Sequence, residues 1–166
     1  MNKIPYYILS LVMSVLPICI AQADELKTVV NPEHLANTTQ YGYSQATIAA
    51  AHARTIYVAG QIGISKDGPN DFQSQVDRSF RNMKEVLEAA GGKVQNIVKI
   101  TLLIKDHDEK KLQYLVKKRR EIFGGNPPAS TLIPVTVLAL DLLEFEIDAI
   151  AVVATHGGPR DDKETP

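Results

Sequence analysis

The chain has 166 residues, of which 45% are hydrophobic, and its 18 basic and 19 acidic side chains leave a net charge of −1. This length suits one domain with a sizeable core, and the near-neutral charge excludes a general attraction to nucleic acid or anionic membranes. The single cysteine, Cys19, lies in the apolar leader, so the remaining chain has no disulfide, thiolate nucleophile or sulfur metal ligand.

The first 23 residues have the pattern of a signal peptide. Residues 6–20 are almost wholly apolar, and Ala21-Gln22-Ala23 is the small-x-small pattern that signal peptidase cleaves. A membrane anchor is the alternative, but the apolar run is shorter than the ~20 residues that span a bilayer. We therefore expect periplasmic or secreted protein, no membrane attachment after cleavage, one domain over residues 24–154 and a polar, disordered tail over 155–166.

Strand patterns open the domain. Residues 26–30 and 44–51 are weak strand candidates, whereas 54–59 is rich in β-branched and aromatic residues and ends at Gly60. A turn over 66–70 closes this group of strands.

Two helices alternate with the later strands. Apolar residues at steps of three and four predict a first helix that stops at Gly91-Gly92, and they are Phe72, Val76, Phe80, Met83, Leu87 and Ala90. Residues 97–104 alternate as a half-buried strand does. A second helix is predicted over 108–123, with a strongly basic outer face.

Two final strands are predicted over 131–140 and 143–154, joined by a tight connection around Asp141. Pro134 cannot donate a ladder hydrogen bond, which places its strand at an edge or a bulge. Because both helices are apolar on one side only, the pattern indicates an α+β fold with two helices on one face of a sheet. The other face is also apolar, so we expect it to be covered by self-association.

Several segments in order resemble one enzyme family over residues 41–153. They include Tyr43-Ser-Gln-Ala46, Ala59-Gly-Gln-Ile62, Leu87-Glu-Ala-Ala-Gly91 and Asn126-Pro-Pro-Ala-Ser130. Together they resemble the Rid family of YjgF-like reactive-intermediate deaminases. The resemblance implies a chorismate-mutase-like mixed sheet, a homotrimer with a central β-barrel, ligand clefts between subunits, and neither a metal nor a cofactor.

The resemblance also implies a pocket whose residues have changed. Tyr43 matches the family's pocket tyrosine, Ala59 stands where a serine is common, and Gly60 permits close approach of the backbone to a ligand. Ser130 replaces the arginine that holds the carboxylate of the family's substrate, and Asp148 replaces a glutamate as the catalytic acid. An amino-acid-derived imine is then expected to be a poor substrate, and a cationic or amine-bearing ligand is favoured.

Each of these residues has a purely structural alternative. Asp148 follows Glu144 and Glu146 in a row of acids on one strand face. Ser130 can cap its own turn, Tyr43 can be an interface aromatic, and Gly60 can simply end a strand.

The sequence thus predicts an exported Rid-like protein that binds a small imine, enamine or amine metabolite in an intersubunit cleft. Its enzymatic form is a hydrolase like 2-iminobutanoate/2-iminopropanoate deaminase, with an altered substrate. The alternative is a non-catalytic binding or interaction protein that kept the trimer. No nucleic-acid partner is expected, since Glu109 and Glu121 interrupt the basic helix, and no metal site, since the histidines lack ligand spacing.

Overall fold

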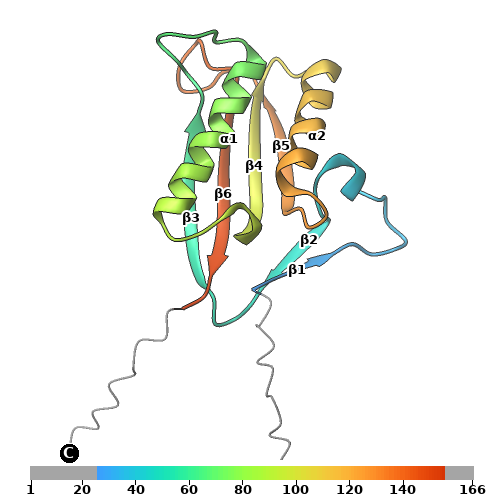
Figure 1. Ribbon diagram of the computed structural model, residues 1–166. Helices are drawn as coiled ribbons and strands as arrows, with labels where there is room; N and C mark the ends of the chain where they lie inside the picture. Colours follow the sequence, from blue (N-terminus) through green and yellow to red (C-terminus); the bar gives the residue numbers. More distant parts are fainter. Residues whose placement is uncertain (1–25, 156–166) are drawn as a thin grey trace, which may run out of the picture.

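The computed structural model describes residues 26–155, so the signal peptide expected over 1–23 and nearly all of the tail lie outside the described residues. A four-stranded sheet with strand order β3-β6-β4-β5 carries two helices on one face (Figure 1). Only the β4–β5 pair is parallel, because α2 crosses over between these strands. Its elements are β3 (Arg54–Ile62), α1 (Phe72–Ala89), β4 (Ile97–Lys105), α2 (Glu109–Phe123), β5 (Ala129–Val135) and β6 (Phe145–Val153).

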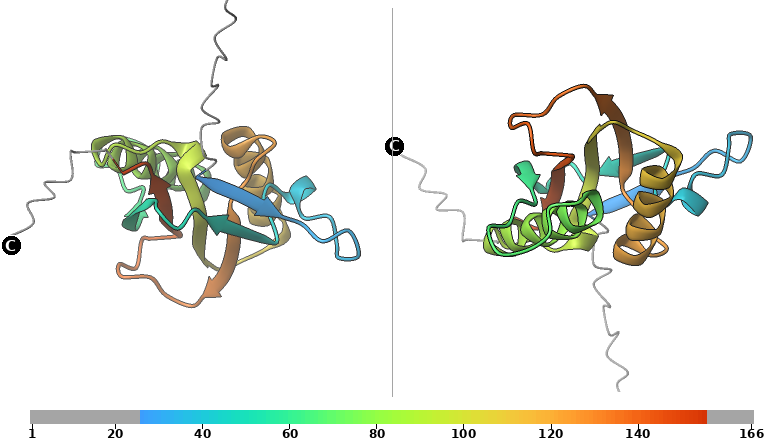
Figure 2. Two further views of the ribbon diagram at one scale, coloured as in Figure 1. Left: turned by 90° about the horizontal axis from the view of Figure 1, so that it is seen from below. Right: turned by 90° about the horizontal axis from the view of Figure 1, so that it is seen from above.

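The α+β architecture and the placement of both helices on one face are confirmed. Viewed along the sheet, α1 and α2 lie on the same side of the strands (Figure 2). Five of the six apolar positions predicted for the first helix are buried, and Val76, Met83 and Leu87 are at most 1% exposed. The sixth, Ala90, is exposed and follows the end of the helix. Asp71 caps this helix by accepting a hydrogen bond of 3.0 Å from the backbone N–H of Ser74.

An acidic residue of α1 joins the two helices. The carboxylate of Asp77 accepts a hydrogen bond of 2.7 Å from the hydroxyl of Tyr114 and lies 2.8 Å from Nζ of Lys118. Burial by itself would raise the pKa of Asp77, but the hydrogen bonds from Lys118 and Tyr114 outweigh it and hold that pKa below its ordinary value. The contact therefore favours the packed arrangement of the helices while Asp77 is ionised.

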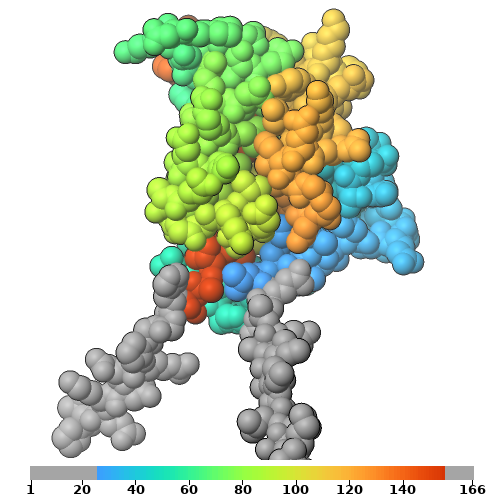
Figure 3. Space-filling model, in the orientation of Figure 1, coloured from blue at the N-terminus to red at the C-terminus, as the bar shows by residue number. Residues whose placement is uncertain are grey.

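The first strands form a separate arm beside α2. β1 (Lys27–Val30) and β2 (Ala46–Ala49) pair with each other in a two-stranded sheet, and in the space-filling view the arm lies below and beside the lower end of α2 (Figure 3). Thr47 fastens the arm to the main sheet, because its hydroxyl donates to the carbonyl of Val98 at 2.7 Å.

The predicted strand over 131–140 is too long, since β5 ends at Val135 and a loop over 136–144 leads to β6. The side chain of Gln75 holds this loop. Its amide donates to the carbonyl of Leu142 at 2.9 Å and accepts from the backbone N–H of Glu144 at 2.9 Å. The apolar residues that suggested a strand lie instead on the loop surface, where Val137 is 58% exposed.

β5 is an edge strand, as Pro134 indicates. The sheet face opposite the helices leaves large apolar side chains in solvent, with Tyr57 78% and Ile133 40% exposed. Among the described residues, no helix is long and apolar enough to cross a membrane.

Candidate functional site

Among residues 26–155, Arg119 of α2 is buried with no carboxylate partner. It is 3% exposed, and its Nη1 donates a hydrogen bond of 3.3 Å to Oγ of Ser130. The guanidinium lies over the ring of Tyr43, 5.5 Å from the centroid, and no described group accepts a hydrogen bond from Nε. Burial lowers the pKa of Arg119, and Tyr43 opposes this shift. An anion would stabilise such a desolvated cation.

Helix periodicity puts Arg119 on the buried side of α2. Leu115, Arg119 and Phe123 recur at steps of four and are the buried residues of this helix, so the guanidinium points toward β5 rather than outward. The basic cluster that the sequence assigns to the outer face therefore loses one member, and an arginine from α2 lies beside Ser130.

The segment before β2 brings Tyr43 to the same place. Ser44 lies beside β5, where its backbone N–H donates to the carbonyl of Pro128 at 2.9 Å and its hydroxyl donates to that of Pro127 at 2.7 Å. Gly42 has φ of +74°, and a Cβ atom there would lie 2.7 Å from Cβ of Arg119. Glycine thus allows this backbone to touch α2 and the tyrosine ring to face the guanidinium.

These groups line a pocket of about 390 Å³ between α2, β5 and the segment that precedes β2. None of the described residues that line it is acidic, and they are Tyr41, Tyr43, His107, Leu112, Val116, Arg119, Ser130 and Leu132. The pocket combines one fixed positive charge, an imidazole, a hydroxyl and apolar walls. Such a set can bind a carboxylate through the guanidinium and can exchange a proton through the imidazole.

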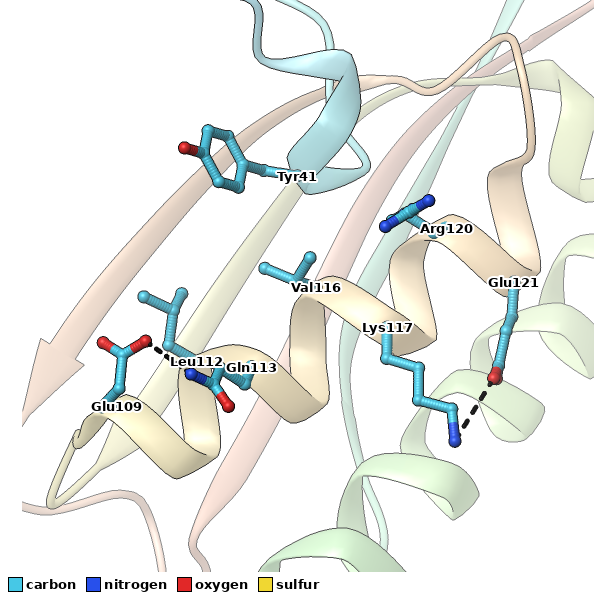
Figure 4. A pocket seen from close by; sticks show the side chains of 8 residues that line it. All are labelled: Tyr41, Glu109, Leu112, Gln113, Val116, Lys117, Arg120 and Glu121. Carbon is cyan, nitrogen blue, oxygen red and sulfur yellow. Dashed lines mark hydrogen bonds and ion pairs between the residues drawn. The ribbon is translucent and has the colours of Figure 1, made fainter.

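A second depression of about 720 Å³ adjoins the pocket along α2. Tyr41, Leu112 and Val116 line both spaces. Figure 4 shows Tyr41 extending over the helix from η1 (Thr39–Tyr41), with Val116 directed toward it. Four polar residues of the rim form two pairs: Gln113 donates to Glu109 at 3.0 Å, and Nζ of Lys117 lies 3.9 Å from Oε1 of Glu121. Arg120 also lines the depression.

The other predicted site residues lie elsewhere in the single chain. Ala59 and Gly60 are in β3, at the sheet edge opposite β5. Gly60 makes room for a side chain, since a Cβ atom there would lie 1.8 Å from Oε1 of Glu146. The structure therefore brings Tyr43 and Ser130 together but keeps both apart from Ala59 and Gly60.

Asp148 lies on the sheet face away from the helices. It pairs in register with Thr101 of β4, whereas Ser130 pairs with Ile100, whose side chain is buried under the helices. Asp148 interacts electrostatically with Lys99. Burial lowers the pKa of this lysine, and the negative charge of Asp148 opposes that shift. Asp148 is therefore beside a cation, although not the one that faces the pocket.

Of the eight residues that line the pocket, the sequence analysis named Tyr43 and Ser130, and it missed Arg119 and His107 among others. Arg119 stands among Lys117, Lys118 and Arg120 in the sequence, which suggested a solvated basic face, but its four-residue spacing from Leu115 and Phe123 was a usable signal. His107 follows β4 directly and looked like an ordinary loop histidine. Among the described residues, no group of three or more His, Cys, Asp or Glu side chains is placed to hold a metal ion.

Comparison with known proteins gives consistent matches. A family model described as Endoribonuclease L-PSP matches residues 34–153. The 2-iminobutanoate/2-iminopropanoate deaminase of Rattus norvegicus is 35% identical over 114 residues, which are 66% of this chain and 79% of the rat protein. A RutC family protein of Pyrococcus horikoshii is 36% identical over 113 residues, 66% of this chain and 85% of its own. The solved structure of YyfB from Yersinia pestis, a Rid family protein of unknown function, has a TM-score of 0.73 and 28% identity, and the match covers 78% of this chain and all of that one.

Proposed function

Because the chain belongs to the Rid family, we propose that it binds imines or enamines that carry a carboxylate in the Arg119 pocket and hydrolyses them with release of ammonia. The observation that carries this proposal is the buried guanidinium beside Ser130 and Tyr43, with no acidic residue among the described ones that line the pocket. A guanidinium offers a carboxylate two parallel donors, which a serine hydroxyl cannot do.

This proposal reverses the ligand charge expected from Ser130 alone. A cationic or amine-bearing ligand in the pocket would place a second positive charge beside Arg119, which is itself 3% exposed. Like charges in a desolvated site repel strongly. The proposed ligand is therefore anionic, and the arginine reaches it from α2 instead of from β5.

The proposed reaction consumes one water molecule and needs no oxidant or reductant. The water oxygen bonds to the imine carbon while one water proton moves to the nitrogen, which gives a carbinolamine. The carbon–nitrogen bond then breaks while the hydroxyl proton moves to the nitrogen, and a carbonyl compound and ammonia leave. Arg119 and Ser130 would hold the carboxylate, and apolar walls such as Val116 and Leu132 would exclude bulk water. His107 lines the same pocket and is a group that could move the proton.

A ring of subunits would unite the two groups of residues. If the β3 edge of one subunit meets the β5 edge of the next, Ala59 and Gly60 of the first approach Tyr43 and Ser130 of the second. Contacts of this head-to-tail kind close into rings. The exposed apolar sheet face supports such an assembly, and Asp148 on that face would be the catalytic acid that the ring brings to the cleft. The signal pattern of residues 1–23 supports the further proposal that the mature protein acts after export.

The experiment measures ammonia release by the mature chain from freshly generated 2-iminobutanoate, relative to buffer, beside the methyl ester of the same imine. We expect acceleration for the carboxylate and little for the ester, because losing a charged contact to a buried partner costs on the order of 2–5 kcal/mol. Decay of both compounds at the buffer rate would refute the deaminase proposal. Light scattering that reports a monomer would remove the intersubunit cleft.

A non-catalytic binding protein is the second candidate. The position of Asp148 beside Lys99, on the opposite sheet face from the pocket, favours it. Saturable carboxylate binding without ammonia release from 2-iminobutanoate would support this alternative.

A further inference from the structure

We infer that the Arg119 pocket and the depression along α2 form one elongated site for an anion with an apolar chain, namely a 2-imino acid whose side chain is larger than the one- or two-carbon group of 2-iminopropanoate or 2-iminobutanoate. The inference rests on the proposed function, since it names the substrate class of the same site.

The two spaces share a common wall. Tyr41, Leu112 and Val116 line both the pocket of about 390 Å³ and the depression of about 720 Å³. Leu112 and Val116 are one helical turn apart, so their side chains lie on the same face of α2. A molecule whose carboxylate reaches Arg119 in the pocket would therefore direct its other end along this face, beneath the ring of Tyr41 (Figure 4).

The volume exceeds what a very small acid needs. Pockets of about 300–1,000 Å³ usually enclose ligands of drug size, and the inner pocket alone falls within that range. The depression continues it over Leu112 and Val116, and Tyr41 remains 47% exposed. An exposed aromatic beside aliphatic side chains is favourable surface for an apolar group to cover.

The wall shared by the two spaces favours an uncharged chain. At the rim, Lys117 pairs with Glu121, and Gln113 donates a hydrogen bond to Glu109. Arg120 also lines the depression, and the fixed charge of the inner pocket belongs to Arg119. Tyr41, Leu112 and Val116, which join the two spaces, carry no charge, so an uncharged chain matches this part of the site.

The test measures the dissociation constants of straight-chain carboxylates, from butanoate to octanoate, by isothermal titration calorimetry of the mature protein below their micelle concentrations. We expect affinity to rise about fourfold per added methylene while the chain remains on the groove. Octylammonium should bind at least 30-fold more weakly than octanoate. Equal affinity for butanoate and octanoate would overturn the inference.

Matched valine variants separate the groove from general hydrophobicity. Val116→Thr keeps the side-chain shape and should weaken octanoate about fivefold to tenfold and butanoate less, because Val116 lines the inner pocket as well as the depression. Val86→Thr changes an exposed valine of α1, 41% exposed, and should leave both unchanged. Equal effects of the two substitutions would contradict an octanoate chain on Val116.

The remaining outcomes are also decisive. If the protein associates further as its concentration rises and octanoate does not compete, the groove is an interface between copies of this chain and the inference is overturned. If octanoate binds as expected but no imine releases ammonia, the elongated site stands while the deaminase proposal falls. If ammonia is released from 2-iminobutanoate but chain length has no effect on binding, the deaminase proposal stands while the elongated site is refuted.

Discussion

Replacing Arg119 by methionine should separate stability from ligand binding. Methionine keeps an unbranched side chain and the Cβ atom that lies close to Gly42, but it removes the charge. The guanidinium contributes one 3.3 Å hydrogen bond to Ser130 and one contact with the Tyr43 ring, which are worth about 1 and up to about 2 kcal/mol. Against these stand the desolvation of a cation and a buried Nε without a described partner, worth about 1–3 kcal/mol for the latter alone.

We therefore expect the free energy of unfolding of Arg119→Met to equal that of the parent or to exceed it by up to about 2 kcal/mol. Carboxylate binding should disappear in the same variant. A ligand at ten times its dissociation constant adds about 1.4 kcal/mol to the stability of the parent, which raises Tm by roughly 5 °C in a domain of this size. Arg119→Met should show no such rise.

The assay is unfolding by urea and by heat, each followed by circular dichroism, with and without hexanoate. Arg81→Met removes an exposed arginine of α1 and is the control, since its stability and its response to hexanoate should match those of the parent. A loss of more than about 2 kcal/mol in Arg119→Met, together with a retained hexanoate effect, would show that Arg119 is structural and refute the anion site.

Three further predictions concern Gly42, Asp148 and Asp77. Gly42→Ala places a Cβ atom 2.7 Å from that of Arg119 at φ of +74° and should lower the unfolding free energy by about 1–3 kcal/mol; Gly125→Ala, which meets no atom within 4 Å, should change it by less than about 0.5 kcal/mol. Asp148→Asn should leave hexanoate affinity within twofold and lower kcat for 2-iminobutanoate by about a hundredfold; unchanged kcat would remove Asp148 from the proposed mechanism. The pKa of Asp77 is lower in the folded chain than in the unfolded one, so the contribution of Asp77 to stability is complete above about pH 4 and is lost as pH falls through the folded pKa. Asp77→Asn should therefore make the dependence of the unfolding free energy on acid pH less steep. An acid unfolding transition that is the same in the variant and the parent would contradict this.

The sequence predicted the parts of the fold that depend on regular periodicity. The stripe from Phe72 to Leu87 gave α1, and the alternation over 97–104 gave β4, because burial on one side of an element repeats at a fixed step. The end of β5 could not be obtained in this way, because the side chain of Gln75, far away in the sequence, holds the following loop. Local composition carries no information about such a contact.

The candidate site was predictable only in part. Tyr43 and Ser130 line the same pocket, but the arginine that contacts both of them, Arg119, comes from α2. It was not identified from the sequence because it stands in a run of basic residues. Charge type suggested solvent for the whole run, whereas the spacing of Arg119 from Leu115 and Phe123 placed it inside. When hydropathy and helical phase disagree at one residue, the disagreement itself marks a position to inspect.

The contact between Arg119 and Ser130 also bears on how relatives of this chain are sorted by motif. A sequence motif gives the position of a functional group along the chain. Ligand binding depends instead on the position of that group in the folded structure. A serine at the start of β5 and an arginine eleven residues earlier can therefore place a guanidinium where an arginine at the serine's position would place one. Relatives that lack an arginine at the position of Ser130 should first be compared at the α2 position of Arg119. Only those without an arginine at either position should be classed as lacking this anion-binding group.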